Sequence, residues 1–135
     1  MDGLMLTGER TVGPARCRVR QTNGVPAHLR PRVRELASLE VPRAEQGKGY
    51  ATTLVHKVCR EADAAGLVLV LWPQPWGDHL ALSRDELEAW YGREFGFVRI
   101  QAEPVLMARQ PGATPMRLQL TPVSAAVIGS TKGRL

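Results

Sequence analysis

A glycine-rich turn with the sequence QGKGYA, at residues 46–51, contains the residues best suited to chemistry. Gly47 and Gly49 lack a Cβ atom, so the main chain can approach an anion closely there. A predicted helix follows at once, and the first N–H groups of a helix have no partner inside the helix. The helix dipole adds about half a positive charge at the same end. Because Lys48 can supply a mobile charge and Gln46 an amide donor, the turn predicts a phosphate site.

The turn differs from two other phosphate-binding motifs. A Walker loop ends in lysine followed by serine or threonine, whereas Lys48 is followed by Gly49. The dinucleotide-binding fingerprint needs three glycines at fixed spacing, and QGKGYA does not have them. Taken alone, the turn is equally compatible with a glycine turn that merely leads into a helix.

The segments on either side of the turn predict a βαβ unit. Residues 33–41 are rich in apolar side chains and are stopped by Pro42, which indicates a strand. After the turn, apolar residues recur at three- and four-residue steps as far as Ala65, which predicts an amphipathic helix. Gly66 is expected to end this helix in a left-handed cap. The run LVLVLW at residues 67–72 is typical of a strand buried on both faces.

A second motif, LEAWYGREFGFVRI, begins about forty residues after the turn. Ser83 and Glu86 predict a capping box at the start of a helix. This helix carries Trp90 and Tyr91, and Gly96 is expected to break it. Two strands are predicted beyond that glycine, at residues 97–100 and 105–108.

Taken together, the two motifs resemble those of the GNAT superfamily of N-acetyltransferases. Gln46, Gly49 and Ala51 occupy the positions of its cofactor-loop signature. Trp90-Tyr91, followed by Gly96-Phe97, matches its downstream aromatic helix and strand. The resemblance covers residues 34–109. It implies an α/β fold with a mixed central sheet flanked by helices, in which two neighbouring parallel strands splay apart.

The resemblance also implies a cofactor and a reaction. Acetyl-coenzyme A is expected as co-substrate, lying where the strands at 33–41 and 67–72 separate. Main-chain groups of Leu39 and Val41 would then bind the pantetheine arm. The amides of the turn, up to Tyr50 and Ala51, would hold the pyrophosphate. An acceptor amine would attack the thioester carbonyl directly.

Two proton transfers accompany such a reaction. Tyr91 matches the family tyrosine near the cofactor sulfur and is assigned as general acid, with a core aromatic as the alternative. Glu35 lies eleven residues before Gln46, as the base does in histone-type members, and is the first candidate for general base. Glu40 is the second candidate, and proton loss through water is a third possibility. Glu35 and Glu40 are five residues apart in one strand, so they are expected to face opposite sides of the sheet.

A single domain over residues 1–135 is expected from the length of the chain. Residues 34–109 form its predicted cofactor-binding core. Residues 1–33 are shorter than the region that lines the acceptor site in the family, which implies an open acceptor site and slightly favours a protein amine over a small molecule. Residues 111–135 are expected to hold an extra strand at 116–120 and a flexible tail.

The charge distribution offers an alternative function. Seven arginines and no acidic residue lie between Arg10 and Arg34, and residues 104–135 are also free of acidic residues. Basic flanks attract anions such as nucleic acid or acidic protein surfaces. The chain could therefore be a binding module that kept the GNAT fold after catalysis lapsed, although Tyr91 and an intact QGKGYA turn argue against that.

The remaining sequence features point to a protein without metal or membrane segment. Cys17 and Cys59 are too few for a disulfide framework and are expected to be buried thiols. The three histidines show no metal-ligand spacing. No apolar run approaches the roughly 20 residues of a membrane span. A cytoplasmic monomer or homodimer is the expectation.

Overall fold

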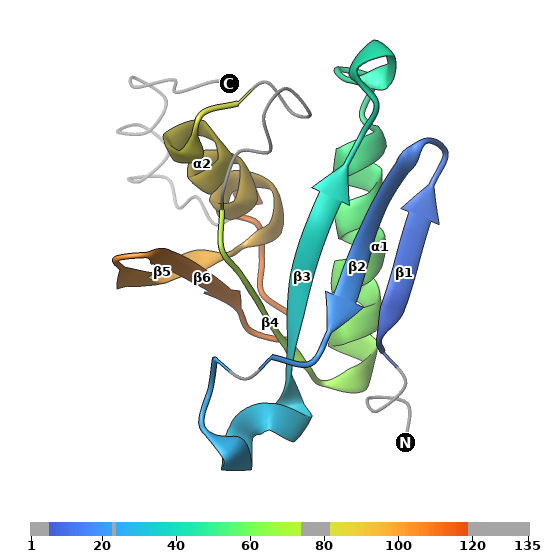
Figure 1. Cartoon of the computed structure of the whole chain (residues 1–135). Helices are drawn as coiled ribbons and strands as arrows, with labels where there is room; N and C mark the ends of the chain where they lie inside the picture. Colours follow the sequence, from blue (N-terminus) through green and yellow to red (C-terminus); the bar gives the residue numbers. More distant parts are fainter. Residues whose placement is uncertain (1–5, 23, 74–81, 119–135) are drawn as a thin grey trace.

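The computed structural model describes residues 6–22, 24–73 and 82–118 and confirms the mixed α/β fold (Figure 1). Six strands form one sheet in the order β1-β2-β3-β4-β6-β5. Strands β3 and β4 run parallel, and the other neighbouring pairs are antiparallel. The fold therefore contains the parallel pair that the sequence predicts on either side of the first long helix.

Two helices and three short 3-10 helices accompany the described strands. In chain order, the elements are β1 (Gly8–Val12), β2 (Ala15–Arg20), η2 (Ala27–Arg32), β3 (Val33–Glu40), η3 (Arg43–Glu45), α1 (Tyr50–Ala65), β4 (Val68–Leu71), α2 (Arg84–Phe95), β5 (Val98–Ala102), β6 (Val105–Arg109) and η4 (Met116–Leu118).

The N-terminal region forms a β-hairpin, β1 and β2, at one edge of the sheet. Alternation along β2 buries Ala15, Cys17 and Val19 and exposes the arginines between them. The alternation of β2 is evident in its sequence, whereas the half-buried residues of β1 show no strong apolar alternation. Cys17 and Cys59 are buried free thiols, as expected.

Helix α1 packs its apolar stripe against the sheet. Leu54, Val55, Val58 and Ala62 are 0% exposed. The helix ends at Gly66, whose φ of 70° is left-handed and whose N–H bonds to the last turn. Both the stripe and the cap follow the sequence prediction.

Helix α2 contributes to the same core from beside α1. Ser83 and Glu86 form the predicted capping box, and Gly96 ends the helix with a φ of 85°. A Cβ atom on Gly96 would lie 2.8 Å from the carbonyl oxygen of Thr114, so only glycine fits this turn. The other face of the sheet carries a smaller cluster, formed by Val33, Val70, Leu106 and Ala108.

The strand predicted at residues 116–120 is wrong for its described part. Met116–Leu118 forms a 3-10 helix, η4, in which the Leu118 N–H donates to the Pro115 carbonyl at 2.8 Å. This local bond closes a tight turn, so the segment curls back on itself instead of pairing with the sheet. The end of the predicted strand and the predicted flexible tail lie outside the described residues.

A buried arginine joins the C-terminal ends of both helices to the sheet. Arg109, at the end of β6, donates to the Asp63 carboxylate of α1 and to the Phe95 carbonyl of α2, both at 2.7 Å. Asp63 also accepts the N–H of Gly112 at 2.7 Å. Burial alone would raise the pKa of Asp63, but these hydrogen bonds and the Arg109 charge outweigh it and lower the pKa.

Candidate active site

The QGKGYA turn leaves main-chain donors open at the start of α1. Gly47 and Gly49 have φ values of 81° and 88°. No heavy atom lies within 4 Å of the Cβ position at either glycine. The helix begins at Tyr50 with Gly49 as its N-cap, and no side chain caps it. Successive N–H groups in such a turn form an anion-binding concavity, so the geometry suits the phosphate site that the sequence predicts.

The two polar side chains of the turn are already engaged. The side-chain amide of Gln46 donates to the Val41 carbonyl at 3.0 Å, which ties the turn to the end of β3. Lys48 forms an ion pair with Glu45 at 3.1 Å, and its side chain is 55% exposed. Exposed pairs of this kind contribute about 0–1 kcal/mol. Lys48 can therefore exchange Glu45 for a bound phosphate, while Gln46 shapes the turn.

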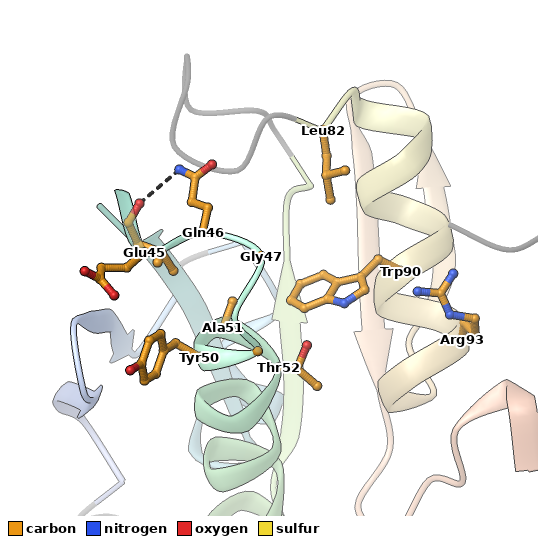
Figure 2. Close-up of a pocket in the computed structure, with 11 residues that line it drawn as sticks. Glu45, Gln46, Gly47, Tyr50, Ala51, Thr52, Leu82, Trp90 and Arg93 are labelled. Carbon is orange, nitrogen blue, oxygen red and sulfur yellow. Dashed lines mark hydrogen bonds between the residues drawn. The ribbon is translucent and has the colours of Figure 1, made fainter. Parts of the chain in front are cut away.

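A cavity of about 340 Å³ lies between this turn and α2 (Figure 2). Its size falls within the range of small-ligand sites. Figure 2 shows Trp90 extending from α2 towards the side of the turn at Gly47. The residues that line the cavity are Val41, Glu45, Gln46, Gly47, Gly49, Tyr50, Ala51, Thr52, Leu82, Trp90 and Arg93.

The α2 wall of the cavity contains a cation that the sequence analysis missed. Arg93 lines the cavity together with Trp90. Its guanidinium forms an ion pair with Glu94 at 3.0 Å and its side chain is 29% exposed. Residues three apart on a helix lie on one face, so the spacing between Trp90 and Arg93 was the signal that could have identified it.

Strands β3 and β4 separate next to the cavity, as the family resemblance implies. They pair at Val33–Val68, Arg34–Leu69 and Glu35–Val70. Beyond Glu35, β3 continues to Glu40 without β4, whereas β4 continues beside β6 as far as Leu71. The diverging strands are visible in Figure 1. Leu39 and Val41 lie on the part of the chain that has left β4.

Tyr91 lies in the core, one residue further along α2 than the cavity-lining Trp90. It is 2% exposed. Its ring centroid is 4.8 Å from that of Trp90 and 5.5 Å from that of Phe97. Its hydroxyl makes no hydrogen bond to the described part of the chain, and burial raises its pKa above the ordinary tyrosine value. The ring packs as a core aromatic, while the hydroxyl is a buried polar group that lacks a described protein partner.

The two candidate bases share one face of the sheet, so the prediction of opposite faces is wrong. Ser38 has a φ of 58°. The β2–β3 register shifts there, because Arg16 pairs with Glu40 whereas Arg18 pairs with Ala37. This β-bulge inserts one residue into β3 and reverses the alternation beyond it. Leu36 and Leu39 consequently both enter the main core.

Each candidate base forms an ion pair with an arginine of β2. Glu35 contacts Arg20 at 3.2 Å, and Glu40 contacts Arg16 at 3.0 Å. The side chain of Glu35 is 12% exposed and that of Glu40 is 39% exposed. Glu35 is thus the more enclosed carboxylate, and it belongs to the last residue pair before β3 and β4 separate.

Other centres of reactivity are not seen in the described residues. Burial raises the pKa of both Cys17 and Cys59 to about 12, so both are protonated thiols at neutral pH. Within residues 6–22, 24–73 and 82–118, no three His, Cys, Asp or Glu side chains lie together as a metal-ligand set. None of the described helices is long and apolar enough to cross a membrane.

Comparison with known proteins identifies the family. The model of the Acetyltransferase (GNAT) family matches residues 4–97. No curated protein and no solved structure matched the chain. The chain therefore belongs to the GNAT acetyltransferase family. The matched region begins before β1, so it includes the N-terminal hairpin as well as the turn and both helices.

Proposed function

We propose that this chain is an N-acetyltransferase that moves the acetyl group of acetyl-coenzyme A to an amine. The observation that carries the proposal is an open main-chain anion site, at Gly47 and Gly49, directly beside a separated pair of parallel strands. Acyl-coenzyme A needs both features, because it combines a pyrophosphate with an extended arm rich in amide groups. Family membership supports acyl transfer as the class of reaction.

The cofactor is proposed to bind along the cavity and into the gap between β3 and β4. The amides from Gly47 to Ala51 would hold the pyrophosphate, with Lys48 of the turn and Arg93 of the α2 wall as the cations. Leu39 and Val41 would bond the pantetheine arm through the main chain. Because the Val41 carbonyl already accepts the Gln46 side chain, Val41 would contribute its N–H.

The reaction is proposed to be direct. The neutral amine attacks the thioester carbonyl, a C–N bond forms, the C–S bond breaks, and the thiolate of coenzyme A leaves. Both cysteines are protonated and buried, which disfavours an acetyl-cysteine intermediate. The role of Tyr91 as the acid that protonates the leaving thiolate rests on the family resemblance, because Tyr91 is buried in the core and is not among the residues that line the cavity.

Glu35 is the preferred general base in this proposal. It lies where the parallel pair ends and is the less exposed of the two glutamates. Glu40 lies further along β3, near the open end of the gap. Proton loss through water remains the third route, and it needs neither side chain.

The alternative of a basic nucleic-acid-binding module has less support from the structure. Four of the seven N-terminal arginines already have partners within the protein. Three form ion pairs, Arg10 with Glu61, Arg16 with Glu40 and Arg20 with Glu35. Arg34 is buried and donates to main-chain carbonyls. The basic run of the sequence is therefore largely neutralised or buried in the fold. Salt-sensitive retention of nucleic acid without binding of acetyl-coenzyme A would favour this alternative.

The decisive assay mixes the chain with acetyl-coenzyme A and a panel of primary amines. Release of free thiol should be accompanied by an equal amount of acetylated amine, which mass spectrometry detects. Thiol release without an acetylated amine would indicate hydrolysis and would contradict the proposal. Absence of both products across peptides and small amines would contradict it as well.

A further inference from the structure

One face of β2 and β3 carries an alternating set of charged side chains. Arg16, Arg18 and Arg20 point away from the core, because the residues between them are buried. Glu35 and Glu40 lie on the same face, since they pair directly with Arg20 and Arg16. We call these five residues the charged face.

The pairing on the charged face leaves one arginine without a carboxylate. Arg16 and Arg20 are each satisfied by a glutamate at about 3 Å. Arg18 lies between them and opposite Ala37. It is exposed and forms no ion pair or side-chain hydrogen bond within the described part of the chain. The charged face therefore presents one guanidinium, with its donors available, between two neutralised pairs.

Arg18 lies one strand away from the start of the strand gap, across β3. Its partner position, Ala37, comes two residues after Glu35, the last residue of β3 that pairs with β4. The opposite face of these strands is filled by α1 and the main core. The face of the sheet that carries these charges is therefore a route by which an acceptor can reach a thioester in the gap.

We propose that the acceptor is a peptide whose reactive amine has an acidic side chain next to it, and that Arg18 binds this carboxylate. The inference rests on the proposed acetyltransferase function. A guanidinium matches a carboxylate with two parallel hydrogen bonds. The charged face, with three arginines and two glutamates, also repels a second cation near Arg18.

The shape of the charged face favours a peptide over a small amino acid. The side chains of Arg16 and Arg20 are 60% and 55% exposed, and the hollow beside Arg18 and Arg20 is shallow and open to solvent. Small ligands usually need a concave site that encloses most of their area, whereas an extended chain can lie across an open face. Residues of the peptide on either side of the amine can then contact β2 and β3.

Two hexapeptides test the proposal. Each has a free α-amine and one lysine, and the residue next to each amine is Glu in one peptide and Gln in the other. The full chain should acetylate the Glu peptide with a kcat/KM about tenfold higher, as expected for one charge-assisted contact at a partly exposed site. Arg18→Ala should remove the preference, and Arg18→Glu should reverse it.

Arg60→Glu is the matched control. Arg60 is an exposed arginine of α1, on the far side of the sheet from the charged face, so this variant carries the same charge change and should keep the tenfold preference. Circular dichroism should show that all three variants are folded.

The outcomes separate this inference from the proposed function. Equal kcat/KM for the two peptides with the wild-type chain would overturn the role of Arg18 while acetyl transfer itself stands. A preference that survives Arg18→Glu would overturn it too. Transfer to free glutamate but to neither peptide would overturn the peptide assignment. Absence of transfer to every amine would refute the proposed function itself.

Discussion

Replacing Gly49 by glutamate should severely weaken binding of acetyl-coenzyme A. Gly49 is the N-cap of α1, and no atom lies within 4 Å of a Cβ placed there. A glutamate side chain therefore fits without a clash, but it would enter the open space where the pyrophosphate is proposed to bind. It would also bring a negative charge to the positive end of the helix dipole, where it competes with the phosphate.

The magnitude follows from Coulomb's law. A carboxylate about 4 Å from one phosphate charge costs about 1 kcal/mol in water and about 4 kcal/mol at an effective dielectric constant of 20. These limits correspond to a Kd raised roughly 5-fold and roughly 1000-fold. The left-handed backbone, with a φ of 88°, adds about 1–2 kcal/mol of strain for a residue with a Cβ. That strain lowers the stability of the fold more than it lowers affinity.

Calorimetric titration with acetyl-coenzyme A measures the effect, and Gly66→Glu provides the control. Gly66 has a φ of 70° and no atom within 4 Å of its Cβ position, and it lies at the other end of α1. The control variant therefore carries the same new charge and similar strain, and its Kd should match that of the wild type. A Kd for Gly49→Glu within twofold of wild type would refute the assignment of the turn as the phosphate site.

Three further substitutions test the chemistry and the fold. Tyr91→Phe should lower kcat with little change in the Kd for acetyl-coenzyme A. It should not destabilise the fold, because the lost hydroxyl has no described hydrogen-bond partner. Full activity of this variant would remove Tyr91 from the mechanism. Glu35→Gln should lower kcat and alter the pH–rate profile, whereas an unchanged profile would redirect attention to Glu40 or to water. Asp63→Asn should reduce the free energy of unfolding at neutral pH by about 2 kcal/mol, since it breaks a partly buried pair with Arg109. Because the folded-state pKa of Asp63 is lowered, the stability that its carboxylate adds is present above the ordinary carboxylate pKa range and is lost as pH falls through the folded-state pKa. In urea titrations from neutral to acidic pH, the free energies of unfolding of wild type and variant should therefore converge. A difference in that free energy that stays constant with pH would contradict the stabilising role of the Asp63–Arg109 pair.

The features that could be predicted from the sequence have strong local signals. The apolar stripe of α1, the glycine at each of its ends and the capping box of α2 are all set by residues close together in the chain. The buried strand β4 could be predicted equally well, because its sequence is a continuous apolar run. These elements are sufficient to place the turn, the helix it begins and the aromatic residues of α2.

The features that were missed depend on contacts between distant segments. The left-handed Ser38 places Glu35 and Glu40 on one face, although strict alternation predicted two. The spacing of the core residues Leu36 and Leu39 indicates the irregularity in the sequence itself, because they are three residues apart, whereas a regular strand buries every second residue. Arg93 was missed because its role as a cavity wall depends on how α2 packs beside the turn.

The proposed function depends on the main-chain amides from Gly47 to Ala51, which would bind the pyrophosphate of the cofactor beside the gap between β3 and β4. Nuclear magnetic resonance of the ¹⁵N-labelled chain, titrated with acetyl-coenzyme A, observes these amides directly. The largest shift changes should fall on Gly47, Gly49, Tyr50 and Ala51, with a second group along β3 beyond Glu35. Saturable binding that leaves these amides unchanged, or no binding at millimolar cofactor, would contradict this proposal.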